Sequence, residues 1–150
     1  MKIIVLSGGD STERKVSLAT GAAVTEALAA AGHEVQSRVI DSVNDVLAMD
    51  DLSTVDVVFP ALHGGEGEDG TLQALLKSKG ATFALSGMAA SALAMNKAAA
   101  KRLMRSANIP TPDWLLVSWD LDSNCPDSLL DKGGPREGYL CLEKLRSEER

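Results

Sequence analysis

The residues best suited to chemistry lie in one short stretch, from His63 to Thr71. It holds one histidine, four glycines and three acidic residues. An apolar, strand-like run (55–62) precedes it, and an amphipathic segment (72–79) follows it. Glycines let a backbone turn tightly and approach a ligand, and the start of a helix offers unpaired N–H groups with a partial positive charge. The pattern predicts a ligand-binding loop; the plainer interpretation is a connecting loop, although a connection needs fewer glycines.

A second candidate lies in the polar turn at residues 8–14, between the first predicted strand and the first predicted helix. Open α/β sheets bind their ligands at such turns. Glu13 could pair there with the ammonium group of an amino acid, and the alternative is a solvated glutamate favoured by the helix dipole. We expect Arg14 and Lys15 to be solvated or paired locally.

Two further side chains have both a chemical and a structural interpretation. The imidazole of His63 could donate to a carboxylate or a developing oxyanion near neutral pH, or it could be a structural histidine with satisfied hydrogen bonds. His33 follows a helix-ending glycine and is expected to be an exposed turn residue. Lys97 shares a predicted helix stripe with Lys101 and Arg105. Solvation is the preferred interpretation for the last two.

The elements that position these residues alternate between strand-like and helical patterns. This order, with short turns, predicts an α/β fold with a doubly wound, mostly parallel sheet. Asp69 and Asn96 are expected to cap helices. The predicted strands span 2–6, 34–40, 55–60 and 81–85, the predicted helices span 17–31, 72–79, 88–95 and 97–107, and 43–49 is a short helix or turn.

A proline pair marks the predicted domain boundary. Pro110 and Pro112 disfavour helix in the residues before them, so we expect one domain over 1–109 and the start of another over 110–150. Residues 114–119 are expected to form a strand that opens the second unit. Residues 120–150 contain few apolar side chains, so they need a partner, a continuation of the chain, or disorder.

Composition excludes several classes of function. The chain has 150 residues, is 45% hydrophobic and carries a net charge of -6. We therefore expect no sequence-independent binding to nucleic acid or to an anionic membrane, since both require clustered positive charge. The apolar start, residues 1–6, is too short for a signal peptide. Cys125 and Cys141 lack the spacing of a zinc site or a disulfide framework, which suits a reducing cytoplasm.

Common nucleotide-binding signatures are missing or misplaced. No GxxxxGK[ST] sequence is present, and no GxGxxG sequence follows the first strand. Gly65, Gly67 and Gly70 match GxGxxG after the third strand, but no acidic residue at the end of a following strand supports the match. A dinucleotide-binding domain is therefore disfavoured.

Three separate blocks, in this order, resemble the D-alanine:D-alanine ligase family. The resemblance covers residues 1–118 and implies the amino-terminal, Rossmann-like domain of an ATP-grasp enzyme, followed by the beginning of the ATP-grasp domain. The blocks are Gly8-Gly9-Asp10-Ser11-Thr12-Glu13-Arg14-Lys15-Val16-Ser17, then Leu62-His63-Gly64 with Gly67-Glu68-Asp69-Gly70-Thr71-Leu72-Gln73, then Ser86-Gly87 with Ser91-Ala92-Leu93-Ala94-Met95-Asn96-Lys97.

The resemblance implies a reaction and a set of roles. ATP would phosphorylate the carboxylate of one D-alanine, and the amine of a second would attack the acyl phosphate, giving the dipeptide used in peptidoglycan. Glu13 would hold the ammonium of the first substrate, and His63 would lie near its carboxyl group and the acyl phosphate. Gly64 would belong to the same substrate-binding loop, and Lys97 would reach the ATP phosphates. A cytoplasmic homodimer is also implied.

The chain departs from the family pattern at several positions. Lys15 and Asn96 stand where acidic residues are common, and only residues 135–138 resemble the later ATP-grasp motifs. The Mg²⁺ ligands are expected outside this chain, so the 150 residues alone are expected to be inactive. Two alternatives stay open: a non-catalytic amino-acid-binding or interaction module, and a ligase with another acceptor, such as D-lactate or D-serine.

Overall fold

The computed structural model describes the backbone of residues 1–119 and 138–143. The chain divides into two compact units, Met1–Met95 and Asn96–Arg150, each of which is described by itself. The predicted boundary after residue 109 stays a prediction. No described helix has both the length and the apolar character needed to cross a bilayer.

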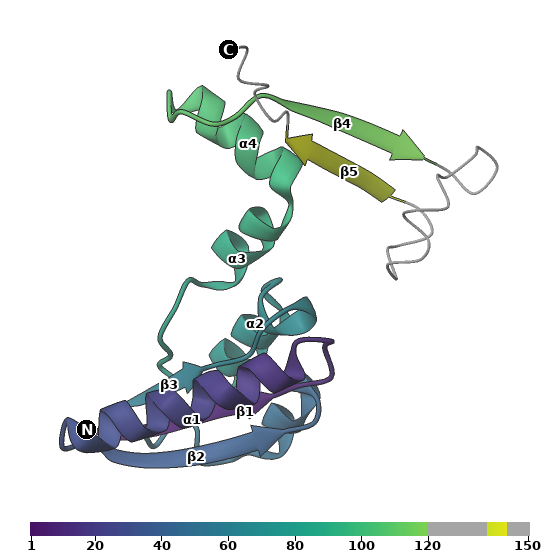
Figure 1. Cartoon of the computed structure of the whole chain (residues 1–150). Helices are drawn as coiled ribbons and strands as arrows, with labels where there is room; N and C mark the ends of the chain where they lie inside the picture. The colour runs from purple at the N-terminus through teal and green to yellow at the C-terminus, as the bar shows by residue number, and fades with distance from the viewer. Residues whose placement is uncertain (120–137, 144–150) are drawn as a thin grey trace. The chain divides into compact units, whose positions relative to one another are not determined.

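The first unit is built on a parallel sheet of three strands in the order β2-β1-β3. They are β1 (Lys2–Gly8), β2 (Glu34–Ile40) and β3 (Val57–Pro60). Helix α1 (Arg14–Ala30) connects β1 to β2 and lies along the sheet (Figure 1). The predicted α/β class with a parallel sheet is confirmed.

The central strand β1 separates two apolar cores. Ile3 and Val5 pack with Val24 and Leu28 of α1 on one face of the sheet. Side chains alternate along a strand, so Ile4 and Leu6 point to the other face and enter the larger core. Because both faces are covered, β1 is apolar along almost its whole length, as expected for a buried parallel strand. The larger core also contains Ile40, Val43, Val46, Leu52, Val58, Leu62, Leu72, Leu76 and Ala81.

Two shorter helical elements supply Val43, Val46, Leu72 and Leu76 to the larger core on the second face. The segment predicted as a short helix or turn is a 3₁₀ helix, η1 (Val43–Ala48), which begins with a capping box between Ser42 and Asp45. A second 3₁₀ turn, η2 (Gly65–Gly67), leads into α2 (Thr71–Ser78), and α3 (Met88–Met95) follows.

Several predicted boundaries are wrong. Helix α1 begins at Arg14 and not at Ser17. The Arg14 N–H donates to the Ser11 carbonyl at 3.1 Å, which closes the first turn. Strand β3 begins at Val57. Gly70 is the N-cap of α2, although the Asp69 carboxylate accepts from the Thr71 N–H at 2.9 Å.

The predicted fourth strand is reduced to a single parallel bridge between Val58 and Phe83. Hydrogen bonds join the Val58 N–H to the Thr82 carbonyl at 2.8 Å and the Ala84 N–H to the Val58 carbonyl at 2.9 Å. The next residue, Leu85, has a left-handed φ of 87°, so the backbone leaves the sheet edge there.

The second unit contains α4 (Lys97–Ser106), β4 (Trp114–Trp119) and β5 (Gly138–Glu143), with β4 and β5 antiparallel. Asn96 caps α4, as predicted, by accepting from the Ala99 N–H at 3.0 Å. Strand β4 is confirmed, whereas β5 was not predicted. Cys125 and residues 135–137 lie outside the described residues, as does most of the predicted tail.

One prediction about α4 is wrong. Lys101, expected to be solvated, is buried, and its ammonium donates to the Thr111 hydroxyl at 3.1 Å. The buried ammonium thus has a polar partner, which a charge removed from water requires. Arg105 is exposed, as expected, and pairs with Asp113.

Candidate functional site

The candidate site lies at the carboxyl edge of the parallel sheet, where the loops after β1 and β3 meet. Gly8 ends β1 with a φ of 102°, and a Cβ atom there would lie 2.3 Å from the Ile40 carbonyl oxygen. The next amide, that of Gly9, donates to the same oxygen at 2.9 Å. Only glycine allows the backbone to turn this close to β2.

Two serines join the loop after β1 to the loop after β3. The buried Ser17 hydroxyl accepts from the Gly8 N–H at 2.8 Å and donates to the Ala61 carbonyl at 2.7 Å. The Ser11 hydroxyl donates to the His63 carbonyl at 2.6 Å and accepts from the Glu13 N–H at 3.2 Å. These bonds hold the two loops together across more than forty residues of sequence.

The structure brings Glu13 next to the His63–Gly64 turn. Gly64 has a φ of 71°, and a Cβ atom there would lie 3.6 Å from the carboxyl carbon of Glu13. Glu13 is exposed, and its carboxylate makes no hydrogen bond or ion pair with the described residues. The Glu13 carboxylate thus lies beside the backbone of this turn, with no hydrogen-bond or ion-pair partner among the described residues.

Arg14 supports the loop rather than a ligand. Its guanidinium donates to the carbonyls of Gly9 at 2.6 Å and Ile40 at 2.8 Å, and it pairs with Asp41 at 2.8 Å. The prediction of local pairing is confirmed for this residue. Lys15 is exposed.

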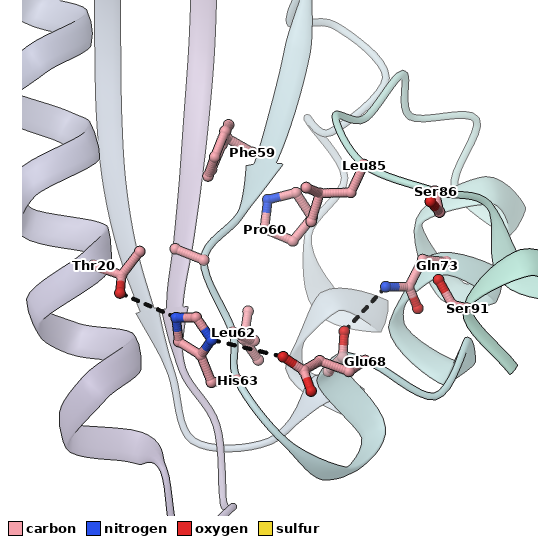
Figure 2. Close-up of a pocket in the computed structure, with 12 residues that line it drawn as sticks. Thr20, Phe59, Pro60, Leu62, His63, Glu68, Gln73, Leu85, Ser86 and Ser91 are labelled. Atoms are coloured by element: carbon pink, nitrogen blue, oxygen red, sulfur yellow. Dashed lines mark hydrogen bonds and ion pairs between the residues drawn. The ribbon is translucent and has the colours of Figure 1, made fainter. Parts of the chain in front are cut away.

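The His63 ring lies between two polar side chains (Figure 2). Its Nε2 atom is 3.0 Å from the Thr20 hydroxyl of α1, and its Nδ1 atom is 3.6 Å from a carboxylate oxygen of Glu68. The side chain is about one-third exposed, at 32%. The imidazole is thus held on both edges while part of it stays open to solvent.

A surface pocket of about 430 Å³ opens beside this ring. Figure 2 shows the polar groups of its wall, which include Thr20, Glu68 and Gln73. Gln73 is buried, and its amide donates to the Gly67 carbonyl at 3.0 Å. Glu13 and Gly64 do not line the pocket. Its remaining lining residues are Phe59, Pro60, Ala61, Leu62, His63, Gly67, Leu85, Ser86 and Ser91.

The sequence interpretation missed Thr20 as a partner of His63. Thr20 lies in an alanine-rich helix, and nothing in the local sequence indicates which segment its hydroxyl contacts. Lys97 begins α4 in the second compact unit and is exposed, and its predicted role stays a prediction. Among the described residues, no group of three or more His, Cys, Asp or Glu side chains could hold a metal ion.

Comparison with known proteins gives a consistent family. Residues 40–86 match the family model described as the D-ala D-ala ligase N-terminus. A D-alanine–D-alanine ligase from Moorella thermoacetica is 47% identical over 77% of this chain and 37% of that protein. One from Pseudomonas entomophila is 45% identical over 99% of this chain and 48% of that protein.

The chain belongs to the D-alanine–D-alanine ligase family. The crystal structure of the ligase from Bacillus anthracis complexed with ATP matches 97% of this chain and 49% of that one, with a TM-score of 0.71 and 30% identity. The VanG D-Ala:D-Ser ligase from Enterococcus faecalis matches 78% of this chain and 45% of that one, with a TM-score of 0.65 and 28% identity. The chain spans less than half of each of these family members.

Proposed function

We propose that this chain is the part of an ATP-dependent D-alanine–D-alanine ligase that binds the first substrate. The observation that carries the proposal is the convergence of the Glu13 carboxylate with the His63–Gly64 turn. A free carboxylate beside this turn, together with the partly exposed imidazole that the turn carries, suits a small zwitterion, because one group attracts the ammonium and the other can donate to the carboxylate.

The proposed reaction has two steps. The carboxylate of the first D-alanine attacks the γ-phosphorus of ATP, so that ADP leaves and an acyl phosphate forms. The amine of the second D-alanine then attacks the acyl carbon, phosphate leaves, and the dipeptide for peptidoglycan precursors is formed. Two small molecules must be held in line, so much of the rate enhancement would come from orientation.

Each predicted residue has one task in this scheme. Glu13 holds the ammonium of the first D-alanine, and His63 with Gly64 contacts its carboxyl end. A donor placed there stabilises the negative charge that develops on the acyl oxygen. Lys97 contacts the phosphates of ATP. The Mg²⁺ ligands are expected outside the described residues, and no step is assigned to the metal. A cytoplasmic homodimer completes the proposal.

The direct test is ATP-dependent D-alanine ligation by the complete gene product, with the variants Glu13→Gln and His63→Ala. Removing the Glu13 charge should raise the KM for the first D-alanine by about tenfold to a hundredfold, the usual value of a hydrogen bond to a charged group. His63→Ala should lower kcat by about a hundredfold.

Glu26→Gln is the matched control, because Glu26 is an exposed glutamate of α1, the helix for which Glu13 is the N-cap residue. It should leave both constants unchanged. Kinetics of Glu13→Gln and His63→Ala equal to those of the control would refute the assigned roles.

A second acceptor is the alternative worth testing, since the chain is also similar to a D-Ala:D-Ser ligase. The same assay with D-serine or D-lactate in place of the second D-alanine distinguishes the acceptors. Calorimetry with ATP tests the non-catalytic module, which would bind D-alanine and ignore the nucleotide.

A further inference from the structure

The His63 ring is contacted on both nitrogen atoms by side chains from separate parts of the first unit. Thr20 comes from α1, and Glu68 follows the 3₁₀ turn η2. The Thr20 hydroxyl lies 3.0 Å from Nε2, and the Glu68 carboxylate lies 3.6 Å from Nδ1 (Figure 2). Two contacts on opposite edges restrict rotation of the ring about its χ2 torsion.

The two partners differ in what they demand of the ring. A hydroxyl can rotate to donate to a bare nitrogen or to accept from a protonated one, so Thr20 suits either tautomer. An ionised carboxylate can only accept. At 3.6 Å its influence on Nδ1 is electrostatic rather than that of a short hydrogen bond. A proton on Nδ1 is attracted to this carboxylate, whereas a lone pair there is repelled by it.

We propose that Glu68 is a positioning residue that holds neutral His63 as the Nδ1–H tautomer, and that the Thr20 hydroxyl then donates to Nε2 and helps to fix the ring. In neutral His63, the unprotonated Nε2 atom then faces α1. Both ring nitrogens can donate hydrogen bonds only after the ring takes up a proton. The relevance to ligation rests on the proposed function, but the tautomer itself does not depend on it.

The test is NMR spectroscopy of the 150-residue chain, without substrate. Long-range ¹H–¹⁵N correlations identify which ring nitrogen carries the proton, at a pH of about 9, above the ordinary titration range of imidazole. The chain has two histidines, so His33 serves as an internal reference in every spectrum. We expect His63 to be mainly the Nδ1–H tautomer. A mainly Nε2–H tautomer in the unmodified chain would overturn the proposal.

Substitutions at Glu68 and Thr20 assign the cause. Glu68→Gln should lower the ratio of Nδ1–H to Nε2–H tautomer at His63 by about twofold to fivefold, the usual strength of a partly exposed charge contact. Thr20→Val should keep the tautomer and move the ¹⁵N shift of Nε2 toward that of an unbonded nitrogen. Thr20→Ser should restore the original shift. An unchanged ratio in Glu68→Gln would also overturn the proposal.

These outcomes are separable from the proposed function. The NMR result depends only on the first unit. His63 can therefore have the proposed tautomer in a protein that does not ligate D-alanine, and a protein that ligates D-alanine can have the other tautomer. The amide signals of β1 report whether each variant is folded, and the unmodified chain decides the tautomer even if a variant does not fold.

Discussion

The two ends of the same parallel sheet each carry a glycine next to a histidine, yet their surroundings are opposite. At the amino end, Gly32 has a φ of 85° and no atom within 4 Å of its would-be Cβ position. At the carboxyl end, Gly64 has a φ of 71° and lies against Ser11 and Glu13. His63 has two polar partners, whereas the His33 side chain has none among the described residues.

The difference follows from the direction of the strands. In this parallel sheet, the loops after neighbouring strands β1 and β3 emerge at the same edge, so residues distant in sequence meet there. The turn at Gly32 connects α1 directly to β2, and the loop that brings Ser11 and Glu13 is at the other end. Identical residue types therefore become a candidate site only where the topology joins two loops.

The largest expected effect comes from Gly8→Ala. The new methyl group would meet the Ile40 carbonyl at 2.3 Å in a left-handed conformation, so we expect a loss of about 4 kcal/mol in the free energy of unfolding. Gly32→Ala, with the same backbone strain but open space, should lose only about 1 kcal/mol. Urea unfolding followed by the amide signals of β1 measures both. Equal losses of unfolding free energy in the two variants would show that both ends of the sheet tolerate an added methyl group equally well.

A smaller effect is expected from Ser17→Ala, which removes the buried hydroxyl between Gly8 and Ala61. Two backbone groups lose their partner, so the free energy of unfolding should fall by about 2 kcal/mol. Ser78→Ala is the control, since that exposed serine bonds only within the end of α2, and it should change stability by less than about 0.5 kcal/mol. Thermal unfolding of both variants decides the point, and a neutral Ser17→Ala would mean that the loops are not joined through this hydroxyl.

The smallest effect is expected from a surface ion pair away from the carboxyl edge. A hydrogen bond from Arg38 lowers the pKa of Asp51 below its ordinary value. The pair therefore contributes stability above the ordinary aspartate pKa of about 4, and this contribution is lost as the pH falls through the lower, folded-state pKa. Because the carboxylate is about half exposed, at 48%, the loss should stay below about 1 kcal/mol.

Asp51→Asn should abolish this acid-dependent step in stability curves measured between pH 6 and pH 2, as a rough span of the aspartate range. Asp113→Asn changes another surface ion pair, with Arg105, and should leave the step in place. A step that survives in Asp51→Asn must come from another carboxylate.

Much of the first unit could be predicted from its sequence because each signal there was local. The apolar run of β1 indicated a strand covered on both faces, and glycines at two turns indicated where a backbone must bend. Glu13 and His63 were identified from these turns. That Glu13 lies beside the His63–Gly64 turn depends on the strand order, which the alternation of elements implied only in outline.

The features that could not be predicted depend on contacts between distant segments. Nothing in the alanine-rich sequence of α1 indicates that Thr20 faces His63, and helical spacing alone placed Lys101 in solvent. The fourth strand was overpredicted because its apolar composition suits a strand, while Leu85 turns the backbone away after one bridge. Strand β5 pairs with β4 from a region without clean periodicity.

The single bridge between Val58 and Phe83 connects the edge of the sheet with the segment that lines the pocket. Directly after the bridge, the same segment continues through Leu85 and Ser86, which line the pocket wall. A molecule bound in this pocket would hold the segment in place. By mass action it would favour the state in which the segment is hydrogen-bonded to Val58. Binding of a molecule in the pocket should therefore be detectable away from the reacting atoms. The expected signal is slower exchange of the Val58 and Ala84 amide hydrogens with solvent deuterium.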